Sequence, residues 1–495
     1  MKILYRIITI YICFIPIKLF TQTLEDNLQK YWNYRYRLRE NFIVVSPNNE
    51  KGTNIPAAYI TGNEFSILHW GDGNGCIQYY IGLLATEYKL LQLNKLDYSE
   101  TRNELLYALK AVERLDKTAE KYFRNPSISK EDDLNGFFIR DDVDDSIKLM
   151  KKSWKNCTIH STYTDYMKRN GAPYEQSKDN VWHYLPNLAL VVQLVDDDEI
   201  KNYAIDIATR MIENMHHTRG KRAKGFGKFI LKIIPDKCLQ VWRIKNPVTN
   251  KDVEDGATVE EIGKGIFNID GFNYGFAEAG YWITKKDLHF GRSFSRHFWF
   301  MAAIRIAPRI GIDSYSYRSL ATTAGFPKIG KTPTRDFLID CAYRDTTHPY
   351  EHFPLIYSIL HIDNDDNYIF QKEFDKYKKL LDEAPIYGNY NFGKEKKYQN
   401  MPIRPDNWSI DNRLVWPEKI NRDLFIGYYN GIDYMLLHNL FWLAYITPQN
   451  QKIENEFDNV NNKKYENLYP HYQKLEPNTH VFIEFPFGDR DKNLD

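Results

Sequence analysis

The chain has 495 residues, a formal net charge of +1, and 43% hydrophobic and 26% charged residues. These values are ordinary for a globular protein and give no electrostatic reason to expect nucleic acid as a partner. Five widely spaced cysteines exclude a disulfide scaffold, and they form no CxxC pair, so neither a metal nor another cofactor is expected.

The N-terminus has the pattern of a secretory signal. Lys2 and Arg6 precede an apolar run from Ile7 to Ile17, and a short polar exit follows at Thr21. The run is below the ~17 residues that a membrane crossing needs, and no later segment is a candidate span. We expect residues 1–22 to be a signal peptide and the mature chain to be secreted or periplasmic.

Helical periodicity dominates the rest of the chain. It predicts helices, mostly in consecutive pairs, at 74–93, 99–123, 179–196, 199–215, 272–284, 291–308, 315–323, 333–343, 352–361, 367–383 and 431–446. Strand patterns are scarce: residues 238–245 are one candidate, with a turn at 246–250, and residues 480–485 are another.

Paired helices with long connections resemble the (α/α) toroid of six-hairpin glycosidases and toroid polysaccharide lyases over roughly residues 60–446. The resemblance is one of pattern, without a short family signature. It implies a mainly α fold, an (α/α) toroid of helical hairpins with a few short strands in loops. Residues 23–446 then form the catalytic domain, and residues 447–495 a tail packed on it or extending from it. A stacked helical repeat is the rival, but no fixed sequence period is visible.

Acidic residues stand at the predicted helix starts. They are Asp72, the pair Asp141 and Asp142, Asp179 and Asp433. Carboxylates at a helix N-terminus are common for capping alone, because free N–H groups and the helix dipole stabilise them there. If these are the inner helices of a ring, however, their starts line one cleft.

Glycoside hydrolysis needs two such carboxyl groups, one to protonate the leaving oxygen and one to act as base or nucleophile. Asp142 and Asp179 are the leading pair, with Asp72 and Asp433 in reserve. Asp141 and Asp142 cannot both serve, because neighbouring side chains point in different directions. We expect the other one to cap a helix or to pair with Arg140.

Aromatic and polar residues near these points are candidate substrate-binding residues. They are Arg140, Trp70, Trp182, His183, Tyr274, Glu278, Asp433 and His438. Stacking on sugar rings and ordinary core packing both explain the aromatic ones.

The sequence therefore predicts an exported carbohydrate-active enzyme, first a glycoside hydrolase acting on a poly- or oligosaccharide. A polysaccharide lyase is the alternative, with Tyr274, His183, Asn180 and Arg140 as its Tyr/His and Asn/Arg set. A non-catalytic glycan-binding envelope protein is a third hypothesis. The basic stretch 216–232 either attracts an anionic polymer or is a solvated loop.

Overall fold

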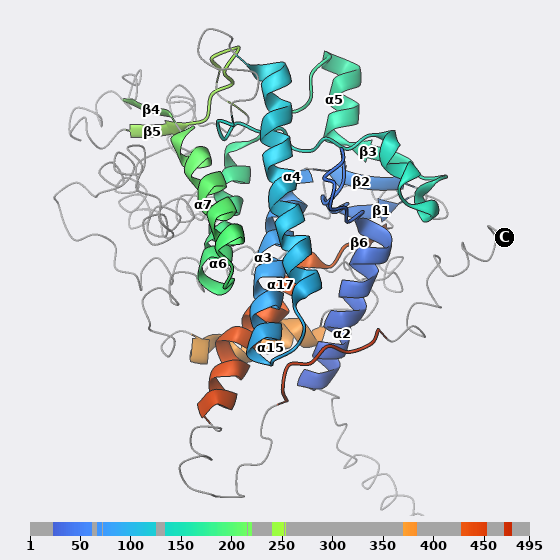
Figure 1. Ribbon diagram of the computed structural model, residues 1–495, viewed down its shortest axis with the longest axis vertical. Coiled ribbons are helices and arrows are strands. Elements are labelled where there is room, and N and C mark those ends of the chain that lie inside the picture. Colours follow the sequence, from blue (N-terminus) through green and yellow to red (C-terminus); the bar gives the residue numbers. More distant parts are fainter. Residues whose placement is uncertain are drawn as a thin grey trace, which may run out of the picture.

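A computed structural model describes residues 23–61, 67–71, 73–124, 134–214, 216–219, 240–251, 253, 370–383, 427–452 and 470–477. Within them the chain is mainly helical (Figure 1). The signal at 1–22, the predicted helices between 272 and 361, and the predicted strand at 480–485 lie outside the described residues.

Six of the eight α-helices in the described residues match helices predicted from the periodicity of the sequence. The eight are α2 (Leu24–Arg37), α3 (Gly73–Leu93), α4 (Ser99–Phe123), α5 (Thr162–Asn170), α6 (Lys178–Leu194), α7 (Asp198–Glu213), α15 (Phe370–Glu383) and α17 (Ile432–Phe441). Short 3-10 turns stand at η3 (Asp145–Leu149) and η4 (Lys152–Trp154), and π turns at η1 (Leu38–Phe42) and η9 (Trp442–Ile446). Two helices, α2 and α5, were not predicted from the sequence.

Helices α3 and α6 lie side by side and run in the same direction. The ring of Tyr79 lies 5.7 Å from that of His183, and one turn further along Gly82 meets Asn187. Residue numbers rise together along the two helices, as parallel packing requires. Their chain neighbours α4 and α7 return on the outside and are joined at both ends by Arg102–Asp197 and Arg210–Asp116 ion pairs.

Helix α17 is the parallel neighbour of α3 on its other side. Asn430, just before α17, donates to the sulfur of Cys76 near the start of α3, and Asn439 donates to Thr86 two to three turns further on. The first described helix, α2, packs against α17, with Tyr34 next to Tyr434. The result is a parallel row α17–α3–α6, backed by α2, α4 and α7 (Figure 1).

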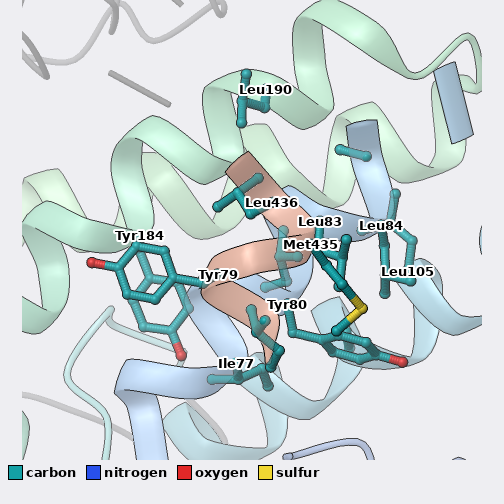
Figure 2. Packing of buried hydrophobic residues seen from close by; sticks show 14 of the residues in the cluster. Ile77, Tyr79, Tyr80, Leu83, Leu84, Leu105, Tyr184, Leu190, Met435 and Leu436 are labelled. Carbon is teal, nitrogen blue, oxygen red and sulfur yellow. The ribbon is translucent and has the colours of Figure 1, made fainter. Parts of the chain in front are cut away.

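Apolar side chains fill the contact between these helices. Ile77, Tyr80 and Leu84 of α3 are almost fully buried, as are Met435 and Leu436 of α17 and Leu190 of α6 (Figure 2). Burying such side chains stabilises the fold by roughly 1.5–3 kcal/mol each. This core holds the three parallel helices in fixed register.

A buried ionic cluster ties α2 to the α3–α4 hairpin. Arg35 lies between two carboxylates, 2.9 Å from Glu87 and 2.8 Å from Glu104. Tyr31 and Tyr80 each donate their hydroxyl to one of these carboxylates. Two buried acids are stable here because every charge has partners in the low-dielectric interior.

A four-stranded sheet caps the end of the bundle where α3 and α17 begin. Its order is β3 (Thr158–Ser161), β2 (Ile67–Gly71), β1 (Tyr59–Thr61), β6 (Gly427–Tyr429), with only the β2–β3 pair parallel. Strand β2 leads directly into α3, and β6 leads into α17. Ile60, Leu68 and Ile159 are buried on the face of the sheet that packs on the helices. Because successive side chains of a strand point to opposite faces, their neighbours in the strands lie on the outward face.

One expectation about local structure needs correction. No helix begins at Asp141 and Asp142: residues 141–144 are irregular, because Phe138 and Arg140 bond in strand fashion to Gln176 and Tyr174. The predicted strand at 238–245 is present as β5 (Gln240–Arg243), which pairs with β4 (His216–Arg219), and the chain after it bonds back across the turn at 246–250, from Asn246 to Lys251 and from Val253 to Ile244. The described residues show a mainly helical protein without a closed ring.

Part of the C-terminal region belongs to the same core. Tyr472 is buried against Trp32 and Trp442, and the backbone of residues 473 and 476 accepts hydrogen bonds from Trp32 and Gln29 of α2. Residues 470–477 are therefore packed on α2 and η9 rather than extending away.

Candidate functional site

The site with the strongest geometric basis is the end of the row where α17, α3 and α6 begin. Because the three helices are parallel, their free N–H groups and positive dipole ends lie at the same end of the molecule. Asp433 is the second residue of α17, Asp179 is the second residue of α6, and Asp72 directly precedes Gly73, where α3 starts. Asp179 and Asp433, two of the acids that we selected, thus stand at equivalent positions of parallel helices.

Asp433 is the one whose side chain the structure describes. It is 7% exposed, and one carboxylate oxygen accepts a hydrogen bond of 2.8 Å from the backbone N–H of Tyr434. The side chains of Asp179 and Trp182 lie outside the described part, although both residues are on α6. Asp72, Tyr274 and Glu278 lie outside the described residues entirely.

Polar side chains lie where α3 contacts α6, within about two turns of the helix starts, and we call them the α3–α6 seam. His183, half-buried, lies against Tyr79, and its carbonyl accepts a hydrogen bond of 2.8 Å from Asn187. Asn180, one turn before His183, is buried and completes a capping box with Ser177 at the start of α6. An imidazole, a phenol and two amides therefore share one stripe of the α3–α6 contact.

The leading predicted carboxylate, Asp142, is held by a structural ion pair. Its two oxygens accept hydrogen bonds of 2.7 and 3.1 Å from Arg114 of α4, and one also accepts the backbone N–H of Gly52 at 3.1 Å. The residue is 1% exposed. Its partner is thus Arg114 rather than Arg140, and both of its oxygens are engaged within the protein.

Its neighbour Asp141 is a cap, as we expected of one of the two acids. It accepts the backbone N–H of Thr162 at 2.9 Å and the hydroxyl of the same residue, at the first turn of α5. It also accepts the N–H of Val143. Burial raises the pKa of Asp141 to about 6, against the lowering effect of these hydrogen bonds.

Arg140 lies in an aromatic stack. Its guanidinium lies 3.8 Å from the ring centre of Tyr174, which in turn stacks on Tyr166 at 3.9 Å. Its Nε donates to the carbonyl of Glu175 at 3.0 Å. These contacts fix the guanidinium on the segment that leads into α6.

Two of the predicted sugar-binding residues are core residues in the structure. Trp70 is fully buried on the inner face of the sheet, and its Nε1–H donates to the carbonyl of Ile55 at 3.0 Å. His438 is fully buried and stacks on Tyr31, and burial lowers the pKa of its imidazole to about 3. Both are better explained by core packing, the second of the two interpretations that the sequence left open.

The outward face of the sheet carries a row that sequence reasoning missed. The register aligns Tyr59, His69 and His160 across β1, β2 and β3, and the rings stack at 4.4 and 5.2 Å. Asp165 of α5 lies 3.7 Å from Nδ1 of His160. Burial and the neighbouring His160 lower the pKa of His69 to about 4, so its imidazole is neutral at neutral pH.

A signal for this row exists in the sequence, in the short alternating runs that contain His69 and His160. The parallel pairing that brings the two together joins segments about ninety residues apart in sequence, as the register gives it. No local pattern specifies such a pair.

In the described part of the chain, no group of three or more His, Cys, Asp or Glu residues is arranged to hold a metal ion. The described helices also include none with the length and apolar character that a membrane crossing requires. Comparisons with protein-family models, with curated proteins and with solved structures find no match to this chain.

Proposed function

We propose that the protein is an exported carbohydrate-active enzyme, a glycoside hydrolase built on an (α/α) toroid. Its active site lies at the end of the helical row where α17, α3 and α6 begin. The observation that carries the proposal is the parallel register of these helices, which brings the start of α3 to the same end as the first turns of α6 and α17, where Asp179 and Asp433 stand.

The helical arrangement supports the toroid. Two adjacent hairpins, α3–α4 and α6–α7, have parallel inner helices and outer partners that return on the other side, which is the repeating unit of such a ring. Helix α2, from the start of the described chain, pairs with α17 from its end. A ring requires this kind of closure between its first and last elements.

Asp72 and Asp179 are the carboxylates that we assign to catalysis, with Asp433 as the third acid of the site. Asp142 is less suitable than the sequence suggested, because Arg114 and Gly52 already bond both of its oxygens. Hydrolysis needs one carboxyl group that stays protonated and one that is ionised. A helix N-terminus favours the ionised form, so one of the two helix-start acids suits the role of base or nucleophile.

A polysaccharide lyase is the second candidate, and one specific contact favours it. The ring of His183 lies against the ring of Tyr79, near the starts of α6 and α3. A phenol and an imidazole are suitable groups for removing a proton and protonating a leaving oxygen in β-elimination. Tyr79 thereby takes the place that the sequence had given to Tyr274.

The test is a screen of the exported protein against neutral and uronate-containing polysaccharides, with two readouts. New reducing ends without ultraviolet absorbance indicate hydrolysis, whereas an absorbing unsaturated uronate indicates elimination. For a hydrolase, we expect Asp72→Asn and Asp179→Asn to lower kcat by roughly 10²-fold or more, in line with loss of an acid or base group, without lowering the Tm.

Three further variants separate the alternatives. Asp142→Asn serves as the matched acid control, because we expect it to lower the Tm. His183→Ala and Tyr79→Phe abolish activity only if the lyase assignment is right. Full activity in both Asp72→Asn and Asp179→Asn rules out the hydrolase assignment, and tight polymer binding without any cleavage supports the glycan-binding alternative.

A further inference from the structure

Two adjacent large apolar side chains face solvent beside the sheet. Leu149, the last residue of η3, is 90% exposed, and Met150, which follows it, is 44% exposed. Among the described residues they are the one pair of exposed large hydrophobic residues adjacent in sequence. Exposed apolar groups of this kind mark interaction sites more often than isolated ones do.

The segment that presents them is firmly anchored. Ile147 and Trp154, on either side of the pair, are buried, and the indole of Trp154 donates to the carbonyl of Asn41 at 3.2 Å. Between them Lys151 donates its ammonium to the carbonyls of Arg39 and Ile43, the latter at 2.8 Å. The exposure of the pair is therefore built into a fixed turn.

Positive charge surrounds the apolar pair. Lys148 precedes it, and Lys152 and Lys155 follow it as exposed residues. Of the nearby acids, Asp145 pairs with Lys148 at 2.5 Å, Asp144 pairs with Lys51 at 2.5 Å, and Glu40 lies near Lys151. The charges of Lys152 and Lys155 thus leave the tip with an excess of positive charge.

We propose that this tip, residues 147–155, inserts Leu149 and Met150 into an anionic lipid surface while its lysines bind the headgroups. A stable protein interface needs roughly 800 Å² from each partner, far more than two side chains supply. Peripheral membrane binding needs only a few apolar side chains together with basic ones. An anionic polysaccharide uses the lysines but gains nothing from Leu149. The inference is independent of the proposed catalytic site.

The test is co-sedimentation of the exported protein with vesicles of phosphatidylglycerol and phosphatidylcholine, and with phosphatidylcholine alone. We expect binding to the anionic vesicles that weakens with salt. Leu149→Asp is expected to lower it by about tenfold or more, and Lys152→Gln and Lys155→Gln by about fivefold each, since each lysine near such a surface contributes about 1 kcal/mol.

Val248→Asp is the matched control, because Val248 is 55% exposed and lies in the turn at 246–250. It is expected to leave vesicle binding unchanged, and all variants are expected to keep the Tm of the parent. Equal binding by Leu149→Asp and the parent overturns the proposal, as does equal binding to both vesicle types. A concentration-dependent dimer that Leu149→Asp abolishes, without vesicle binding, assigns the tip to a second copy of the chain and equally overturns it.

Discussion

The close packing of α3 on α6 makes a sharp prediction at Gly82. A Cβ added there lies 2.0 Å from Oδ1 of Asn187 and 2.9 Å from its Cγ. Ordinary contact begins near 3.4 Å, so the Gly82→Ala substitution forces the amide of Asn187 aside or moves the helices apart. Asn187 is buried, and turning it away breaks its hydrogen bond to the carbonyl of His183.

The magnitude follows from three contributions. Overpacking costs about 1–3 kcal/mol, and the lost hydrogen bond costs about 1 kcal/mol. Alanine in place of glycine inside a helix returns about 1 kcal/mol. Gly82→Ala is therefore expected to lower the free energy of unfolding by about 1–3 kcal/mol. In the double variant with Asn187→Ala, the side chain ends at Cβ, 3.4 Å from the new methyl group, and the clash disappears.

A double-mutant cycle by urea denaturation measures this coupling. The double variant should be about 2 kcal/mol more stable than the sum of the two single changes predicts. Gly171→Ala is the control, since Gly171 has φ +69° with nothing within 4 Å of an added Cβ. Its backbone strain should cost about 1–2 kcal/mol, with no coupling to Asn187. Additivity of Gly82→Ala and Asn187→Ala within about 0.5 kcal/mol refutes the close parallel packing.

Three further outcomes are expected. Asp142→Asn leaves Arg114 without its carboxylate and should lower the free energy of unfolding by about 3 kcal/mol in chemical denaturation; an unchanged midpoint contradicts the structural role. The pKa of His438 is about 3 in the fold, below the ordinary value of 6.5, so its contribution to stability is present above pH 6.5 and is lost as the pH falls toward 3. In thermal scans below pH 6.5, the Tm of His438→Gln should fall less steeply with decreasing pH than the Tm of the parent. Equal slopes for the two proteins contradict the assignment of this pH dependence to His438. Tyr472→Ala should cost about 3–4 kcal/mol by creating a cavity, measured by the same scans, if residues 470–477 belong to the core.

The sequence predicted the long helices well because their stability comes from one continuous apolar stripe. Residues 99–123 show such a stripe, and α4 has these same bounds. Helix α2 escaped prediction because Lys30 and Arg35 on its buried side are charged. Only a tertiary partner makes that burial favourable, and Glu87 and Glu104 lie more than fifty positions away along the chain.

The site was predictable in its outline but not in its assignments. Acids at helix starts are visible in the sequence, and Asp179 and Asp433 do lie in the first turns of α6 and α17. Whether an acid is available for chemistry depends on contacts that the sequence does not display. Asp142 was selected for catalysis, but its carboxylate is bonded by Arg114, which stands twenty-eight positions earlier in the sequence. The pairing of Tyr79 with His183 depends likewise on the register of two helices.

The pairing of α2 with α17 has a consequence for how the chain folds. The hydroxyl of Tyr434 donates to the carbonyl of Asn27, and the amide of Asn439 donates to the hydroxyl of Tyr31, across 407 and 408 positions. Closing a loop of that length costs about 5 kcal/mol of chain entropy, beyond the constant for any loop. A nascent chain therefore lacks the α17 partner of α2 until synthesis has passed residue 441. Contacts this distant in sequence slow folding and make completion of the core one of its last events.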